Sequence, residues 1–235
     1  MFKELQKCLR DRGPAPIVTW VSDIGRIELS AITFNNAISK ASNFLVDGLE
    51  LEEDATVNIS LGNHWQSPVW MGTALSTALT IVEDDPAITF GDKSQAQTWQ
   101  GSPDEFVVVS RDPFGMPDKE IPAGFVNGSA EVRNFGDYFS PRWSISPDHN
   151  AIAIDSSKFT WYQLMQRAQG LADANELKPG QSYGLYGSSD LITTIALQVV
   201  LPVVFGHSVV LIDQVNPDLA AIKKQEKLEQ IVMLG

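Results

Sequence analysis

Three short polar clusters hold the residues of this chain that are best suited to chemistry. The first is Ser156-Ser157-Lys158, which follows the apolar run Ile152-Ala153-Ile154. Two hydroxyl groups and an ammonium group could bind an anion such as phosphate. With Asp155 before it, the same stretch also has the composition of a β-turn, because Asp and Ser favour turns. The turn is the interpretation that we favour.

The other two clusters are Asn63-His64-Trp65 and Ser188-Ser189. Each follows a short apolar run that predicts a strand, and α/β proteins bind ligands beyond the carboxyl ends of such strands. We therefore expect the main pocket to touch at least two of the three clusters. Simpler interpretations stay open: His64 would be a loop residue that packs or faces water, and Ser189 or Asp190 would cap the next helix.

The elements that must position these clusters form a pattern that occurs twice. The first copy reads as helix, strand, helix and strand at 32–45, 57–60, 70–78 and 79–82. The second copy follows about 130 residues later, at 160–171, 183–186, 191–205 and 208–212. Helices that alternate with apolar strands build parallel α/β layers. The pattern therefore predicts an α/β fold with two similar layered subdomains rather than a solenoid.

The two copies suggest a division of the chain. We expect residues 1–89 to form the first subdomain, residues 151–235 the second, and residues 90–150 a connection that packs on both. This connection is rich in Gly, Pro and aromatic residues, and connections of such length are often functional. Its rings either cap the two subdomains or form a surface for a partner or a ligand lid.

Composition disfavours several classes of partner. The chain has 235 residues, with 17 Lys and Arg against 29 Asp and Glu, which gives a net charge of −12. Nucleic acids and anionic membranes attract clustered positive charge, so neither is an expected partner. The longest apolar stretch, 191–205, falls short of the roughly 20 residues of a membrane span. A single cysteine, Cys8, and a charged N-terminus without a signal-peptide pattern predict a cytoplasmic protein.

Metal chemistry is not indicated by the sequence. The three histidines, His64, His149 and His207, lie far apart and have no partner at ligand spacing. We therefore expect no metal site.

The repeated pattern resembles adenylate-forming enzymes, the superfamily of acyl-CoA synthetases, luciferases and peptide-synthetase adenylation domains. The first copy shows it in Leu29-Ser30 and in 49–57, and Asn63 stands at the place of the family's asparagine after the strand. The second copy shows it in Phe205-Gly206-His207-Ser208-Val209-Val210-Leu211. Asp112-Pro113-Phe114-Gly115 and Glu131-Val132-Arg133 are similar to the middle region of short actinobacterial relatives.

The resemblance implies the N-terminal part of such an enzyme, with ATP, AMP or CoA as ligands only by family likeness. The family's phosphate loop is rich in Ser, Thr and Gly and ends in a Lys. The corresponding stretch, 154–159, is shorter, has no glycine and carries the negative charge of Asp155. The stretch 186–190 lacks the family's histidine, and the family's later motifs would lie beyond residue 235.

These departures favour a non-catalytic protein that binds a small ligand or a protein partner. Two alternatives stay open. The chain could have acyl-CoA synthetase-type activity that another chain completes, or it could be a structural protein that forms a homodimer.

Overall fold

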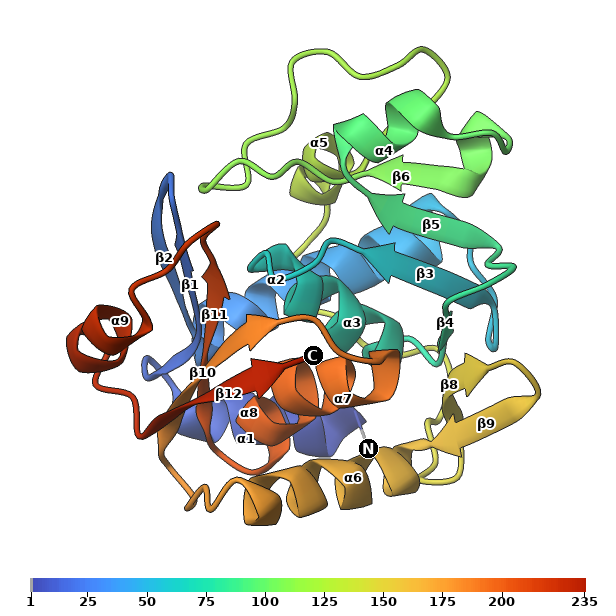
Figure 1. Ribbon diagram of the computed structural model, residues 1–235. Coiled ribbons are helices and arrows are strands. Elements are labelled where there is room, and N and C mark those ends of the chain that lie inside the picture. The colour runs from blue at the N-terminus through green and yellow to red at the C-terminus, as the bar shows by residue number, and fades with distance from the viewer. Residues whose placement is uncertain (1) are drawn as a thin grey trace. The chain divides into compact units, whose positions relative to one another are not determined.

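A computed structural model describes residues 2–235, with side chains from Leu5 onward (Figure 1). The described strands form two sheets, in the orders β12-β10-β11-β1-β2 and β7-β6-β5-β3-β4-β8-β9. Contacts divide the chain into two units, and each unit holds one sheet. Unit 1 comprises the described residues up to Asn35, Gly62–Pro68 and Trp161–Gly235. Unit 2 comprises Asn36–Leu61 and Val69–Thr160.

The strands of unit 1 are β1 (Pro16–Ser22), β2 (Gly25–Ser30), β10 (Ser182–Gly187), β11 (Ser208–Asp213) and β12 (Gln230–Leu234). Its helical segments are α1 (Phe2–Arg12), α6 (Trp161–Ala174), α7 (Leu191–Ile195), η4 (Ala196–Val200), α8 (Leu201–Val204) and α9 (Leu219–Gln225). Helices α2 (Ala31–Asn43) and α3 (Gln66–Ser76) each begin among residues of unit 1 and end among residues of unit 2.

The strands of unit 2 are β3 (Thr56–Ser60), β4 (Thr80–Val82), β5 (Ile88–Gly91), β6 (Phe106–Val108), β7 (Val126–Asn127), β8 (Asn150–Ile154) and β9 (Ser157–Thr160). Its other helical segments are η1 (Phe44–Gly48), α4 (Lys93–Thr98), η2 (Pro103–Glu105), α5 (Gly128–Glu131) and η3 (Val132–Asn134).

The core of unit 1 forms around three parallel strand pairs. β11 pairs with both β1 and β10, and β10 also pairs with β12, all in parallel. The middle residues of β11, Val209–Ile212, are all buried rather than alternately buried and exposed, as is usual for parallel strands covered on both faces. On α6, the buried residues Trp161, Leu164, Ala168 and Ala172 recur at intervals of three and four, which gives the helix one apolar face.

Unit 2 is built in the same way around β3, which pairs in parallel with β4 on one side and with β5 on the other. Phe90 of β5 stacks on Trp70 of α3, with ring centroids 4.6 Å apart. Phe44 lies edge-on to the same Trp70 at 6.3 Å. These rings cover one face of the sheet, and the opposite face carries the side chains of Asn58 and Thr89, which are register partners.

The predicted α/β fold with two similar layered subdomains is confirmed. The first copy runs β2, α2, β3, α3, β4, and the second runs β9, α6, β10, a helix over 191–204 and β11. In both copies the first strand pairs antiparallel with its predecessor, and the last two strands are parallel neighbours. Each copy places its first strand in one sheet and its last two in the other. Each unit thus draws on both halves of the chain, and the ranges 1–89, 90–150 and 151–235 remain a prediction about domains.

Candidate functional site

The cluster Ser156-Ser157-Lys158 lies at a tight hairpin turn in unit 2. β8 and β9 are antiparallel, and Ile154 pairs with Ser157. Only Asp155 and Ser156 are left to form the turn, and Asp155 has a left-handed φ of 52°. Asp is among the residues that tolerate this conformation best. The interpretation of this stretch as a β-turn is confirmed, and all three residues of the cluster are exposed.

Asn63 lies in the loop between β3 and α3, within unit 1. Its Nδ2 donates a hydrogen bond to the carbonyl oxygen of Gly187 at 2.8 Å. Its Oδ1 accepts a hydrogen bond from Nε2 of Gln198 at 3.2 Å. Gln198 is 1% exposed and lies in the π-helical turn η4, a distortion that is frequent near functional sites. The Asn63 amide therefore joins the loop after β3 to the end of β10.

His64 is buried, and Trp65 beside it is half-buried. The His64 ring is fully buried and lies edge-on to Trp20, with ring centroids 4.8 Å apart. Its other neighbour is Trp65, at 5.6 Å. The backbone N–H of Gln66 donates to Nδ1 of His64 at 3.4 Å, which fixes the start of α3. The interpretation of His64 as a packed loop residue fits these contacts.

Ser188 and Ser189 lie between β10 and α7, also in unit 1. The backbone N–H of Thr193 donates to the Asp190 carboxylate at 2.9 Å, so Asp190 is the helix cap. Burial acts to raise the pKa of Asp190, but the hydrogen bonds from Thr193 and the charge of Arg167 outweigh it and hold the pKa below its usual value. A fixed negative charge therefore stands where the helix dipole would favour an anion.

The eight candidate residues fall into two groups. Asn63, His64, Trp65, Ser188 and Ser189 belong to unit 1, and the Asn63–Gly187 hydrogen bond brings their two loops together. Ser156, Ser157 and Lys158 belong to unit 2.

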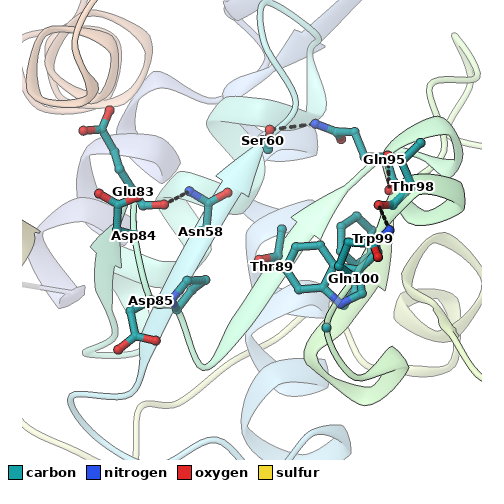
Figure 2. A pocket seen from close by; sticks show the side chains of 13 residues that line it. Asn58, Ser60, Glu83, Asp84, Asp85, Thr89, Gln95, Thr98, Trp99 and Gln100 are labelled. Atoms are coloured by element: carbon teal, nitrogen blue, oxygen red, sulfur yellow. Dashed lines mark hydrogen bonds between the residues drawn. The ribbon is translucent and has the colours of Figure 1, made fainter.

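Unit 2 contains a cavity of about 580 Å³ that the sequence did not reveal (Figure 2). It lies against Asn58 and Ser60 of β3 and Thr89 of β5, and its lining includes none of the eight candidate residues. One signal could have indicated it. Only five residues, Glu83 to Ala87, separate β4 from β5, which is too short for the usual crossover helix between parallel strands.

A Gly-x-Ser-x-Gly spacing also occurs, in Gly180-Gln181-Ser182-Tyr183-Gly184. A nucleophile elbow of this pattern places the serine on a sharp turn after a strand and before a helix. Ser182 instead opens β10 and lies at its first position. The spacing is therefore not an elbow.

A partly buried cluster around Arg12 closes unit 1 at the end of α1. The guanidinium donates to the carbonyl oxygens of Pro202 and Pro16, at 3.0 and 2.7 Å, and to that of His207. It also donates to the hydroxyl of Ser208 at 2.6 Å. The His207 ring is 2% exposed, with Nδ1 3.3 Å from the carbonyl oxygen of Gln181. Burial, together with the positive charge of Arg12, lowers the pKa of His207 below its ordinary 6.5, although the Gln181 carbonyl opposes the shift.

This lowered pKa predicts a loss of stability in mild acid. The unfolded chain binds a proton at His207 more readily than the folded chain does. The free energy of unfolding should therefore have its full value above about pH 6.5 and should fall as the pH drops below that value. Asp92 and Asp190 stay ionised in this range, since their pKa values lie below the usual 3.8. Urea unfolding between pH 8 and 5 measures the effect, and H207Q should flatten the curve. An unchanged slope in H207Q would assign the loss to other groups.

Two kinds of feature are absent from residues 2–235. No group of three or more His, Cys, Asp or Glu side chains there is arranged to hold a metal ion. No helix in the same range is long and apolar enough to cross a membrane.

The fold is similar to that of enzymes whose structures have been solved. An acyl-CoA synthetase of Brucella canis superposes with a TM-score of 0.80 over 98% of this chain and 47% of its own, at 11% identity. The acetoacetyl-CoA synthetase of Streptomyces lividans superposes with a TM-score of 0.77 over 99% of this chain and 42% of its own, at 12% identity. The chain has the fold of part of an acyl-CoA synthetase. It spans about half the length of the solved structures that it matches.

Sequence comparison adds one relative of similar length. A protein of Mycobacterium tuberculosis, whose name gives only a numbered family, is 28% identical over 97% of this chain and 94% of its own length. No protein-family model matches the chain. The predicted resemblance to adenylate-forming enzymes is thus confirmed at the level of fold.

Proposed function

We propose that this chain is a short, non-catalytic relative of adenylate-forming enzymes that corresponds to their N-terminal part and acts by binding a small ligand. The fold supports the family relation, and the relative in M. tuberculosis is an actinobacterial protein of similar length.

The β8–β9 turn carries the non-catalytic part of the proposal. A phosphate loop works because several backbone N–H groups of one flexible, glycine-rich segment converge on phosphate oxygens. Here the two strands pair up to Ile154 and Ser157, so only two residues remain outside the ladder. One of them, Asp155, is an acid that would repel a triphosphate. Adenylation needs electrostatic stabilisation of the transferring phosphoryl group, and this turn does not supply it.

Asp190 supports the same conclusion from unit 1. The helix that follows β10 could hold an anion at its first turn. Its own cap carboxylate already accepts the Thr193 N–H, and its pKa stays low. A phosphate would have to displace an ionised carboxylate, which costs binding energy.

We place the ligand in unit 1 at the loops that Asn63 joins, with Asn63, Trp65, Ser188 and Ser189 as the contact residues and the buried His64 as the residue that packs behind them. Ser156, Ser157 and Lys158 are a separate weak anion site in unit 2. Ser188 is exposed, so a bulky side chain there would block the loop without entering the core.

The proposal predicts that ATP does not stabilise the chain. A ligand at 100 times its Kd adds about 2.7 kcal/mol to the free energy of unfolding. Thermal unfolding with ATP, AMP, CoA and acyl-CoA should show no such gain for the two nucleotides. A gain from either of the other two should disappear in S188W. Stabilisation by ATP that K158A removes would instead show that Ser156, Ser157 and Lys158 bind nucleotides.

A further inference from the structure

The cavity of unit 2 lies on the sheet face that faces away from Trp70. Its floor includes Asn58, Thr89 and Phe106, which form one row across β3, β5 and β6 because Asn58 pairs with Thr89 and Thr89 with Phe106. The neighbouring residue Phe90 points the other way and stacks on Trp70. The floor and the packed core are therefore opposite faces of the same three strands.

The cavity exists because no helix connects β4 to β5. The connection crosses β3 directly, and Nδ2 of Asn58 holds it by donating to the carbonyl oxygens of Val82 and Glu83, at 2.9 and 3.3 Å. On the other side the face is covered by α4, where Ala96 packs with Phe106 and Val108. The space over the sheet between the β4–β5 connection and α4 remains open. Its volume lies in the usual range for small-molecule sites.

Polar atoms on the floor are available to a ligand. Thr89 is 6% exposed, and its hydroxyl makes no hydrogen bond within the described part of the chain. The Oδ1 of Asn58 accepts no hydrogen bond from any described residue, since only Nδ2 is engaged. Thr89 is therefore a largely buried residue whose hydroxyl is still accessible from the cavity, and Oδ1 of the half-buried Asn58 is accessible beside it. Both oxygens can accept hydrogen bonds from a ligand in the cavity.

The walls of the cavity are acidic on one side and aromatic on the other. Glu83, Asp84 and Asp85 stand on the connection, opposite Trp99 (Figure 2). The Trp99 ring lies 5.0 Å from that of Phe106, and its indole N–H donates to the carbonyl oxygen of Ser102 at 3.1 Å. The lining contains no Lys, Arg or His. Carboxylates and aromatic rings together attract organic cations.

We propose that this cavity binds a small organic amine in its protonated form. The ammonium group lies by Glu83, Asp84 and Asp85 and donates to Asn58 and Thr89. The apolar body of the amine lies against Trp99 and Phe106. A metal ion does not fit, because no group of three acidic, His or Cys side chains within residues 2–235 is arranged to ligate one. This proposal goes beyond the proposed function, since it does not depend on whether the chain has adenylation activity.

The test compares three probes of one shape by calorimetric titration of the full chain. 2-Phenylethylamine is a cation, 2-phenylethanol is neutral and phenylacetate is an anion. The amine should bind, and the other two should bind at least about tenfold more weakly, which corresponds to 1.4 kcal/mol. Equal binding of the three probes, or no binding of the amine, would overturn the proposal.

Variants locate the site. The triple variant E83Q/D84N/D85N should weaken amine binding about tenfold, because it removes the three negative charges that attract the ammonium group. The matched variant E52Q/E53Q/D54N neutralises another exposed run of three acids and should change the affinity less than about twofold. T89V keeps the shape of the floor and should also weaken binding.

Equal effects of the two triple variants would show that the amine senses only net charge, and the proposal would be wrong. ATP-dependent pyrophosphate release, measured on the same preparation, separates this proposal from the proposed function. Pyrophosphate release would contradict the non-catalytic role alone, whereas a failure of amine binding would contradict the cavity site alone.

Discussion

R12M is expected to lower the free energy of unfolding by about 2–4 kcal/mol. The methionine keeps an unbranched apolar side chain in place of the aliphatic part of the arginine but removes every donor of the guanidinium. The carbonyl oxygens of Pro202 and His207 then lose a charged donor in a partly buried place. A fully buried acceptor left without a partner costs about 1–3 kcal/mol, so two partly buried ones together account for the expected loss. Urea unfolding followed by circular dichroism measures the change.

Arg10 provides the matched control on the same helix. It is exposed, and among the side chains described from Leu5 onward its one hydrogen-bond partner is Oε1 of Gln6, at 3.5 Å. R10M should therefore change stability by less than about 0.5 kcal/mol. R12K should fall between the two variants, because an ammonium group cannot serve four acceptors in the planar arrangement of a guanidinium. If R12M and R10M have equal effects, the Arg12 cluster does not hold α1 in place.

F106A is expected to cost about 3–5 kcal/mol, the range for removing a buried aromatic ring. Phe106 is 1% exposed at the centre of a cluster with Ala96 and Val108. Its ring meets Trp99 at 5.0 Å and Phe125 at 5.7 Å. The truncation removes both aromatic contacts and leaves a void that β6 cannot close, since β6 is hydrogen-bonded to strands on both sides.

F114A is the control for this change. Phe114 is 81% exposed, so the same truncation should alter stability by no more than about 0.5 kcal/mol. The midpoint of urea unfolding should move for F106A and stay in place for F114A. A loss below about 1 kcal/mol in F106A would mean that this cluster is not part of the unit 2 core.

The order of elements was predictable from sequence because its signals are local. The helix expected at 160–171 and the apolar run of β11 depend on neighbouring residues only, and both are confirmed, the helix as α6. The exchange of strands between the copies was not predictable. β1, the neighbour of β2, pairs with β11 of the second copy, and β4 of the first copy pairs with β8. Such long-range pairings cannot be recognised in a short stretch of sequence.

The candidate site was predictable in part for the same reason. Asp190 caps a helix through a residue three positions away, and the sequence indicated this interpretation. The hydrogen bond between Asn63 and Gly187 spans 124 residues, so sequence alone could only suggest that their loops meet. The cavity arises because the short β4–β5 connection has no crossover helix. A missing helix leaves no motif in the sequence. That is why the lining residues Asn58, Thr89 and Trp99 were not singled out.

Isotope exchange between ATP and pyrophosphate tests the non-catalytic role most directly. The purified chain would be incubated with magnesium, ATP, labelled pyrophosphate and a panel of carboxylic acids, with an active acyl-CoA synthetase as the positive control. Because the Asp155-Ser156 turn supplies no phosphate cradle, the account predicts no exchange above the protein-free blank. Acid-dependent exchange by this chain alone, abolished in K158A, would contradict it and show a working adenylation site.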